Sequence, residues 1–171
     1  MALISILNIA LSYLSLGGQT IERTTAIFLA REGIELVRAI RDSQWLNPMK
    51  VWPYGLDDND SDYDEYWIID YDDTNLTEAI FSPPNQETVD KCTNCQLYLT
   101  PSGQYTHSAS GNTQTVFKRL IHITNGDDLG AICPDPSNSH GCEKKVESIV
   151  YWTERGRSHQ ITLESRLTDW R

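Results

Sequence analysis

The stretch AIFLAREGIELVRAIRDSQW, residues Ala26–Trp45, decides the fold. Small and apolar residues recur in it at spacings of three and four, which puts them on one face of an α-helix. These residues are Ala26, Leu29, Ala30, Gly33, Val37 and Ile40. Arg31 with Glu35, and Arg38 with Asp42, place opposite charges four residues apart, where a pair stabilises a helix by roughly 0.2–0.5 kcal/mol. We therefore expect an amphipathic helix over 20–43 whose apolar face packs on the rest of the chain.

The segment that precedes this stretch is apolar and carries no charge. Residues 1–16, MALISILNIALSYLSL, form a shorter run than the ~20 apolar residues that span a membrane. The run also lacks the basic start and the small-residue cleavage site of a secretory signal. Gly17 and Gly18 follow, and each weakens a helix by about 1 kcal/mol relative to alanine, so we expect any irregularity there.

The expected helix is longer than the domain on which it packs. If residues 1–41 are all helical, the helix is roughly 60 Å long at about 1.5 Å per residue, which exceeds the width of a small domain. We expect residues 1–16 to have no partner within the monomer. An uncharged apolar segment that stands clear of its own domain needs lipid or other helices to cover it.

The rest of the chain has the alternating pattern of β-strands. Strands are predicted at Trp67–Tyr71, Val116–Thr124, Val146–Thr153 and His159–Leu167, with a further hairpin over 95–107. We expect five or six antiparallel strands of about five to nine residues, spanning at most ~30 Å at ~3.3 Å per residue. The predicted class is α+β: a long N-terminal helix over 1–45, packed on an antiparallel β-rich head over 46–171.

Charge is distributed very unevenly along the chain. Residues 51–90 contain twelve Asp or Glu and no Lys or Arg, which gives −12, whereas the whole chain carries −10. Nucleic-acid binding depends on neutralising phosphates, so an acidic chain without a basic cluster or a Gly-rich phosphate loop argues against it.

An acidic loop over 57–65 is the strongest site-like feature of the sequence. Alternating carboxylates can supply the oxygen ligands that calcium needs. The candidate ligands are Asp58, Asp60, Asp62 and Asp64. An EF-hand loop that began at Asp58 would need glycine and glutamate where Tyr63 and Ile69 stand, so the pattern is not an EF-hand. The alternatives are a solvated acidic loop and a calcium site of another type. We expect no cofactor apart from calcium at this loop.

The four cysteines allow three interpretations. They are Cys92, Cys95, Cys133 and Cys142. Two pairs can bind zinc, although eight residues separate the second pair, more than in ordinary zinc ribbons. Disulfides in an oxidising compartment are the favoured alternative, with Cys133 bonded to Cys142 across a turn-rich loop and Cys92 bonded to Cys95. Free thiols are the third.

The sequence indicates no catalytic site. His107, His122, His140 and His159 lack metal-like spacing, and we expect ordinary surface histidines. No serine lies in a G-x-S-x-G elbow, and the paired carboxylates belong to an acidic run where pairing says little. The chain is therefore predicted not to be an enzyme.

The stretch LAREGIELVRAIRDSQW, Leu29–Trp45, resembles the second half of the N-terminal helix of type IV pilin-like proteins of the minor-pilin and pseudopilin kind, which carry a similar LAxEGIExVRxIRDxNW. Three stretches of the head are similar in the same order: YLTPSGQYTH, TVFKRLIHI and VYWTERGRSHQITLESRLTDW. The resemblance covers most of the chain from Ala26 onward. Such pilins begin with a basic leader, a Gly-Phe-like cleavage site and a glutamate, none of which is printed here. We expect that the printed start lies inside the hydrophobic helix, or that this is a short, unprocessed relative.

The resemblance implies a non-enzymatic structural subunit of a type IV pilus or a type II secretion pseudopilus. It implies an inner-membrane anchor with an extracytoplasmic head, followed by assembly with other pilin-like subunits into a cell-surface filament. Helix packing in that assembly would use small residues, namely Ala10, Gly17, Gly18, Ala26, Ala30 and Gly33. The alternative is a surface-anchored, adhesin-like binding module whose acidic loop is ordered by calcium.

Overall fold

The structure, a computed structural model, describes residues 2–46, 56, 65–82, 86–125 and 143–168, with the backbone alone for 2–19, 44, 45 and 125. One helix and seven strands lie in these ranges. In chain order they are α1 (Ala2–Trp45), β1 (Glu65–Ile68), β2 (Thr77–Glu78), β3 (Gln96–Leu99), β4 (Tyr105–Thr106), β5 (Thr113–Asn125), β6 (Glu143–Glu154) and β7 (Arg157–Thr168). Every strand pairing among them is antiparallel, so the predicted α+β class is confirmed.

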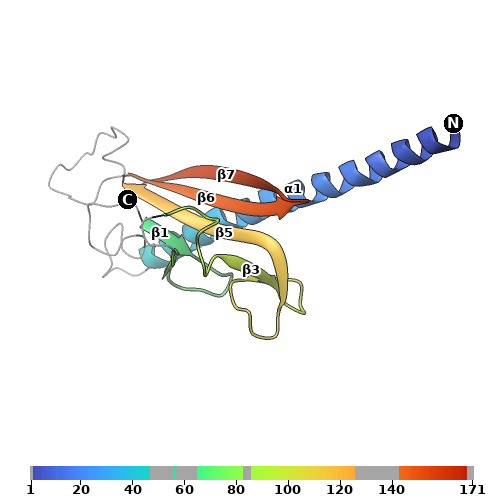
Figure 1. The fold of residues 1–171 in the computed structure, drawn as a ribbon. Coiled ribbons are helices and arrows are strands. Elements are labelled where there is room, and N and C mark those ends of the chain that lie inside the picture. The colour runs from blue at the N-terminus through green and yellow to red at the C-terminus, as the bar shows by residue number, and fades with distance from the viewer. Residues whose placement is uncertain (1, 47–55, 57–64, 83–85, 126–142, 169–171) are drawn as a thin grey trace.

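Helix α1 is continuous over 44 residues, which gives it a length of about 66 Å at ~1.5 Å per residue. It passes through Gly17 and Gly18 without interruption, so the irregularity expected there does not occur. Figure 1 shows that the C-terminal half of α1 lies along the sheet, whereas the N-terminal half projects beyond it.

Strand β5 is the centre of the sheet. One of its edges pairs with β6 over Phe117–Asn125. Its other edge is shared, because β1 pairs with residues 121–123 and β3 pairs with residues 113–118. Strand β2 extends the sheet beyond β1, β4 extends it beyond β3, and β7 pairs with β6 along its whole length.

The β6–β7 hairpin turns on two residues, Arg155 and Gly156, with φ of 49° and 77°. Positive φ at both central positions is the backbone form that matches the twist of a hairpin. The predicted 95–107 hairpin also forms, as β3 and β4, and Gly103 takes a φ of 86° in its turn.

The long strands correct the predicted lengths. Strands β5, β6 and β7 contain 13, 12 and 12 residues, and 12 residues span about 40 Å at ~3.3 Å per residue. The sequence estimate stopped where the apolar alternation stopped, but polar residues such as Glu143 and Lys144 continue the hydrogen-bonded ladder. The short strand β2 was not predicted, and it adds a seventh strand to the five or six expected.

The predicted face of α1 packs on the sheet. Ala26, Leu29, Ala30, Val37 and Ile40 are all buried. Val37 and Ile40 lie in one core cluster with Val146 of β6 and Leu167 of β7. Nearer the N-terminus, Ala26 and Ala30 lie in a second cluster with Phe117, Val150 and Trp152. Strand β6 therefore runs antiparallel to α1 beneath it.

The charged pairs on α1 differ from those predicted. Arg38 binds Glu35 at 2.7 Å rather than Asp42, and its other terminal nitrogen donates to Ser165 Oγ of β7 at 2.8 Å. Arg41 binds Asp42 at 2.9 Å. The hydrogen bond to Ser165 holds the Arg38 side chain over the sheet. Helical spacing alone therefore could not predict which residues Arg38 binds.

Candidate functional site at the helix–sheet junction

Helix α1 packs closely on the sheet at Gly33. A methyl group added there would come 2.9 Å from Ile121 Cδ1, 3.3 Å from Arg119 Cδ, and closer still to Ser148 Oγ. Real side chains do not accept contacts this short without moving. The glycine is therefore required by the packing of this helix on this sheet.

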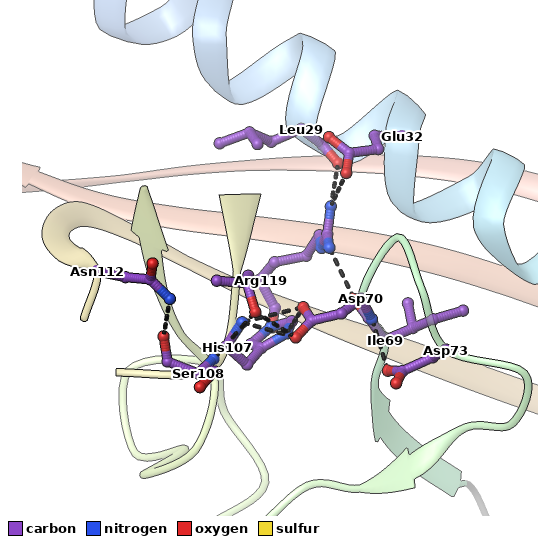
Figure 2. A network of polar contacts seen from close by, with 10 residues as sticks. Leu29, Glu32, Ile69, Asp70, Asp73, His107, Ser108, Asn112 and Arg119 are labelled. Carbon is purple, nitrogen blue, oxygen red and sulfur yellow. Dashed lines mark hydrogen bonds and ion pairs between the residues drawn. The ribbon is translucent and has the colours of Figure 1, made fainter. Parts of the chain in front are cut away.

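Arg119 of β5 lies beneath this contact and is fully buried. Its guanidinium donates to the carbonyl oxygen of Ile69 at 2.7 Å and to that of Leu29 in α1 at 3.4 Å. It also lies 3.4 Å from Glu32 Oε1 of the helix. Burial lowers the pKa of Arg119 while Glu32 and Asp70 oppose that shift, and an arginine with such partners stays charged. One side chain thus joins the helix, the central strand and the segment after β1 (Figure 2).

Asp70 follows Ile69 and carries the second half of the network. It accepts hydrogen bonds from Thr106 Oγ1 at 2.7 Å and from the backbone nitrogen of His107 at 2.9 Å. His107 Nδ1 lies 2.6 Å from Asp70 Oδ1. Burial raises the pKa of Asp70, but the hydrogen bonds and charge of His107 outweigh that effect and hold it below its usual value.

The ring of His107 is turned inward. Its side chain is only 6% exposed, and its Nε2 lies 3.4 Å from the carbonyl oxygen of Arg119. Both neighbours of the ring are acceptors, so an imidazolium that donates from both nitrogens satisfies them. Figure 2 shows the ring of His107 lying between Asp70 and the backbone of Arg119. This network fixes β1, β4, β5 and α1 to one another.

The histidine prediction is wrong for His107, which is buried and paired. His122 is also partnered: its Nδ1 lies 3.0 Å from Glu147, and its ring stacks on Tyr66. Burial raises the pKa of Glu147, yet Lys145 and His122 together keep it below its usual value. His159 stacks on Trp152. The fourth histidine, His140, lies outside the described residues.

The first cysteine pair is a disulfide. Cys92 and Cys95 are bonded, with 5.5 Å between their Cα atoms, and both are fully buried. The bond confirms the disulfide prediction for this pair. Asn94, between them, accepts from the nitrogen of Ile80 at 2.8 Å and donates to the carbonyl of Glu78 at 3.0 Å, so this short loop braces the segment after β2.

Other predicted site residues lie outside the part of the chain that the structure describes. Cys133 and Cys142, and the calcium candidates Asp58, Asp60, Asp62 and Asp64, lie outside the described residues, so both remain predictions. Within the ranges described, no three His, Cys, Asp or Glu side chains gather as a metal site would need. Likewise, no helix in that part of the chain is both long and apolar enough to cross a membrane.

The predicted assembly residues separate into two groups. Ala10, Gly17 and Gly18 lie in the projecting half of α1, where the structure gives the backbone alone. Ala26 and Ala30 are fully buried against the chain's own sheet, and Gly33 packs closely on it. In this structure, therefore, the second group serves packing within the monomer.

Comparison with known proteins gives no relative: no family model, curated protein or solved structure matches the chain.

Proposed function

We propose that this chain is a non-enzymatic structural subunit of a type IV pilus or a type II secretion pseudopilus, with the lollipop form of a pilin. One observation carries the proposal: α1 is far longer than the sheet needs. Among the side chains of α1 that the structure describes, the buried ones begin at Ala26, and residues 2–25, which precede it, extend about 36 Å at ~1.5 Å per residue. Residues 2–21 contain no charged side chain.

The pilin-like motif supports the same division of the helix. The motif over Leu29–Trp45 includes the positions that contact the sheet, among them Gly33, Val37 and Arg38. These residues attach the helix to its head. The half that precedes them is then left for a bilayer or for other helices, which is the role that the resemblance implies for it.

Under this proposal, the projecting half holds the subunit in the inner membrane with its head outside the cytoplasm, and later packs among equivalent helices in a filament. Ala10, Gly17 and Gly18 are the small residues available there for close helix contacts. The buried Cys92–Cys95 disulfide suits a head that folds in an oxidising compartment.

A structural rather than an enzymatic role is supported by the polar network. Arg119, Asp70 and His107 form a buried charged cluster, and their printed contacts are with carbonyls, hydroxyls and carboxylates of the protein itself. Such a cluster orders the head and leaves no acid or base directed at a ligand.

The test compares the full chain with a variant that lacks residues 2–20, each produced in the source organism. We expect the full chain in the membrane fraction and in filaments sheared from the cell surface, and the shortened chain in neither. Ser102→Ala, in the exposed β3–β4 turn, is the control and should behave as the unaltered chain. Recovery of the shortened chain in membranes and filaments at the level of the full chain would refute the proposal.

A further inference from the structure

Four arginines differ from the other basic residues of the described chain. Most Lys and Arg side chains there are held by an acidic group or a carbonyl, as Arg38, Lys118 and Arg166 illustrate. By contrast, four exposed arginines in the described ranges take part in no hydrogen bond or ion pair. These are Arg23, Arg31, Arg155 and Arg157.

Three of the four lie where α1 leaves the sheet. Strand β6 runs antiparallel to the helix, and its Trp152 lies in one core cluster with Ala26. Arg155 comes three residues after Trp152, about 10 Å further along at ~3.3 Å per residue. Arg23 comes three residues before Ala26, about 4.5 Å along the helix in the same direction. Figure 1 shows the β6–β7 turn beside the helix at the start of its projecting half.

This position is also the boundary between apolar and charged sequence. Residues 2–21 carry no charge, and Ile21, the last of them, exposes 69% of its surface. The charged sequence begins with Glu22 and Arg23. The acidic residues at this end, Glu22 and Glu154, are both partly buried, whereas Arg155 and Arg157 at the hairpin tip are exposed. In a chain of net charge −10, three of the four unpaired arginines among the described residues thus lie at the base of the apolar helix.

We propose that Arg23, Arg155 and Arg157, the basic collar, bind the anionic headgroups of phospholipids. The proposal rests on the proposed function, because it needs the projecting half of α1 to enter a bilayer. A guanidinium can donate two parallel hydrogen bonds to a phosphate, and basic residues beside a membrane segment are attracted by anionic lipid. Long basic side chains at the end of an apolar helix place their charge in the headgroup layer.

The collar also fixes how the head stands on the membrane. One contact comes from the helix and two come from the hairpin tip, so the head is held at two places rather than by α1 alone. The end of the β6–β7 hairpin that carries Arg155 and Arg157 should then face the lipid surface, and the opposite end of the two strands should face away from it.

The test measures binding of the full chain to two kinds of vesicle, after dilution from detergent, by flotation. One kind is phosphatidylcholine alone, and the other adds phosphatidylglycerol. The variant is Arg155→Gln with Arg157→Gln. The matched control is Lys145→Gln with Arg166→Gln, which removes the same charge from the same hairpin, away from its tip.

We expect the full chain to bind both kinds of vesicle, with a preference for the anionic kind that declines as salt rises. Each basic residue near such a surface contributes about fivefold, so the tip variant should lose about 25-fold of the anionic preference. Its binding to neutral vesicles should not change, and the control should keep the preference.

The outcomes separate this inference from the proposed function. Equal binding of the full chain to both vesicles, or an unchanged preference in the tip variant, refutes the collar while leaving the helix as an anchor. Equal loss of preference in the control refutes it too, because net charge alone would explain the result. Failure of the full chain to bind either vesicle refutes membrane anchoring itself.

Discussion

Gly33→Ala is the substitution that tests the helix–sheet junction most sharply. The added methyl group would meet Ser148 Oγ first, then Ile121 Cδ1 at 2.9 Å and Arg119 Cδ at 3.3 Å. Overpacking of this kind costs about 1–3 kcal/mol. Replacing a helix glycine by alanine returns about 1 kcal/mol. The expected net effect on the free energy of unfolding is a loss of about 0–2 kcal/mol, in place of the usual gain.

A second substitution identifies the contact responsible. Ser148 Oγ is buried and has no hydrogen-bond partner among the described residues, so Ser148→Ala alone should be neutral or slightly stabilising. In the Gly33→Ala background it removes the nearest obstacle. We expect the double variant to regain about 1 kcal/mol beyond additivity.

The assay is urea unfolding of residues 21–171, monitored by tryptophan fluorescence. It is carried out on the unaltered sequence, on both single variants and on the double variant. A Gly33→Ala chain at least as stable as the unaltered one, with no coupling to Ser148, would refute the close packing of α1 on β6.

Three further predictions concern the head. Arg119→Lys keeps the charge but cannot reach the helix and the Ile69 carbonyl together, so unfolding should require about 2 kcal/mol less; an unchanged stability would contradict the bridging role. The pKa of Asp70 is lower in the folded chain than in the unfolded chain, so its ionised carboxylate stabilises the fold. This stabilisation is fully present above the pKa of the unfolded state and is lost as pH falls through the pKa of the folded state. Asp70→Asn should therefore make the free energy of unfolding fall less steeply at acid pH. The exposed control Asp72→Asn should leave that dependence unchanged. Cys92 and Cys95 are fully buried, so a reductant followed by a thiol label should modify them only after unfolding; rapid labelling of the native head would exclude that burial.

Much of the architecture follows from local patterns. The three- and four-residue spacing in 26–40 predicts both the helix and the face that it buries, because a helix turns once in about 3.6 residues. The turn residues at 101–103 and 154–157 predict the two hairpins, since these segments need glycine at positive φ. Each signal lies within a few residues of the element that it specifies.

The polar network could not be predicted in this way. Asp70, His107 and Arg119 are separated by 37 and 12 residues, and only the pairing of β5 with β1 and β3 brings them together. Nothing local distinguishes Asp70 from the other acidic residues of its region. Arg119 did carry a signal, because it occupies an inward position of the alternation between Phe117 and Ile121. A charged residue at such a position indicates a buried partner elsewhere in the chain.

The central claim is that the projecting half of α1 is made for a partner outside the monomer. Light scattering after size-exclusion chromatography, without detergent, tests it directly on the full chain and on residues 21–171. The account predicts a folded, monomeric 21–171 chain and a full chain that aggregates or stays in solution only with detergent. A full chain that is a soluble monomer, with Leu3, Leu7 and Leu14 buried against its own head, would contradict it.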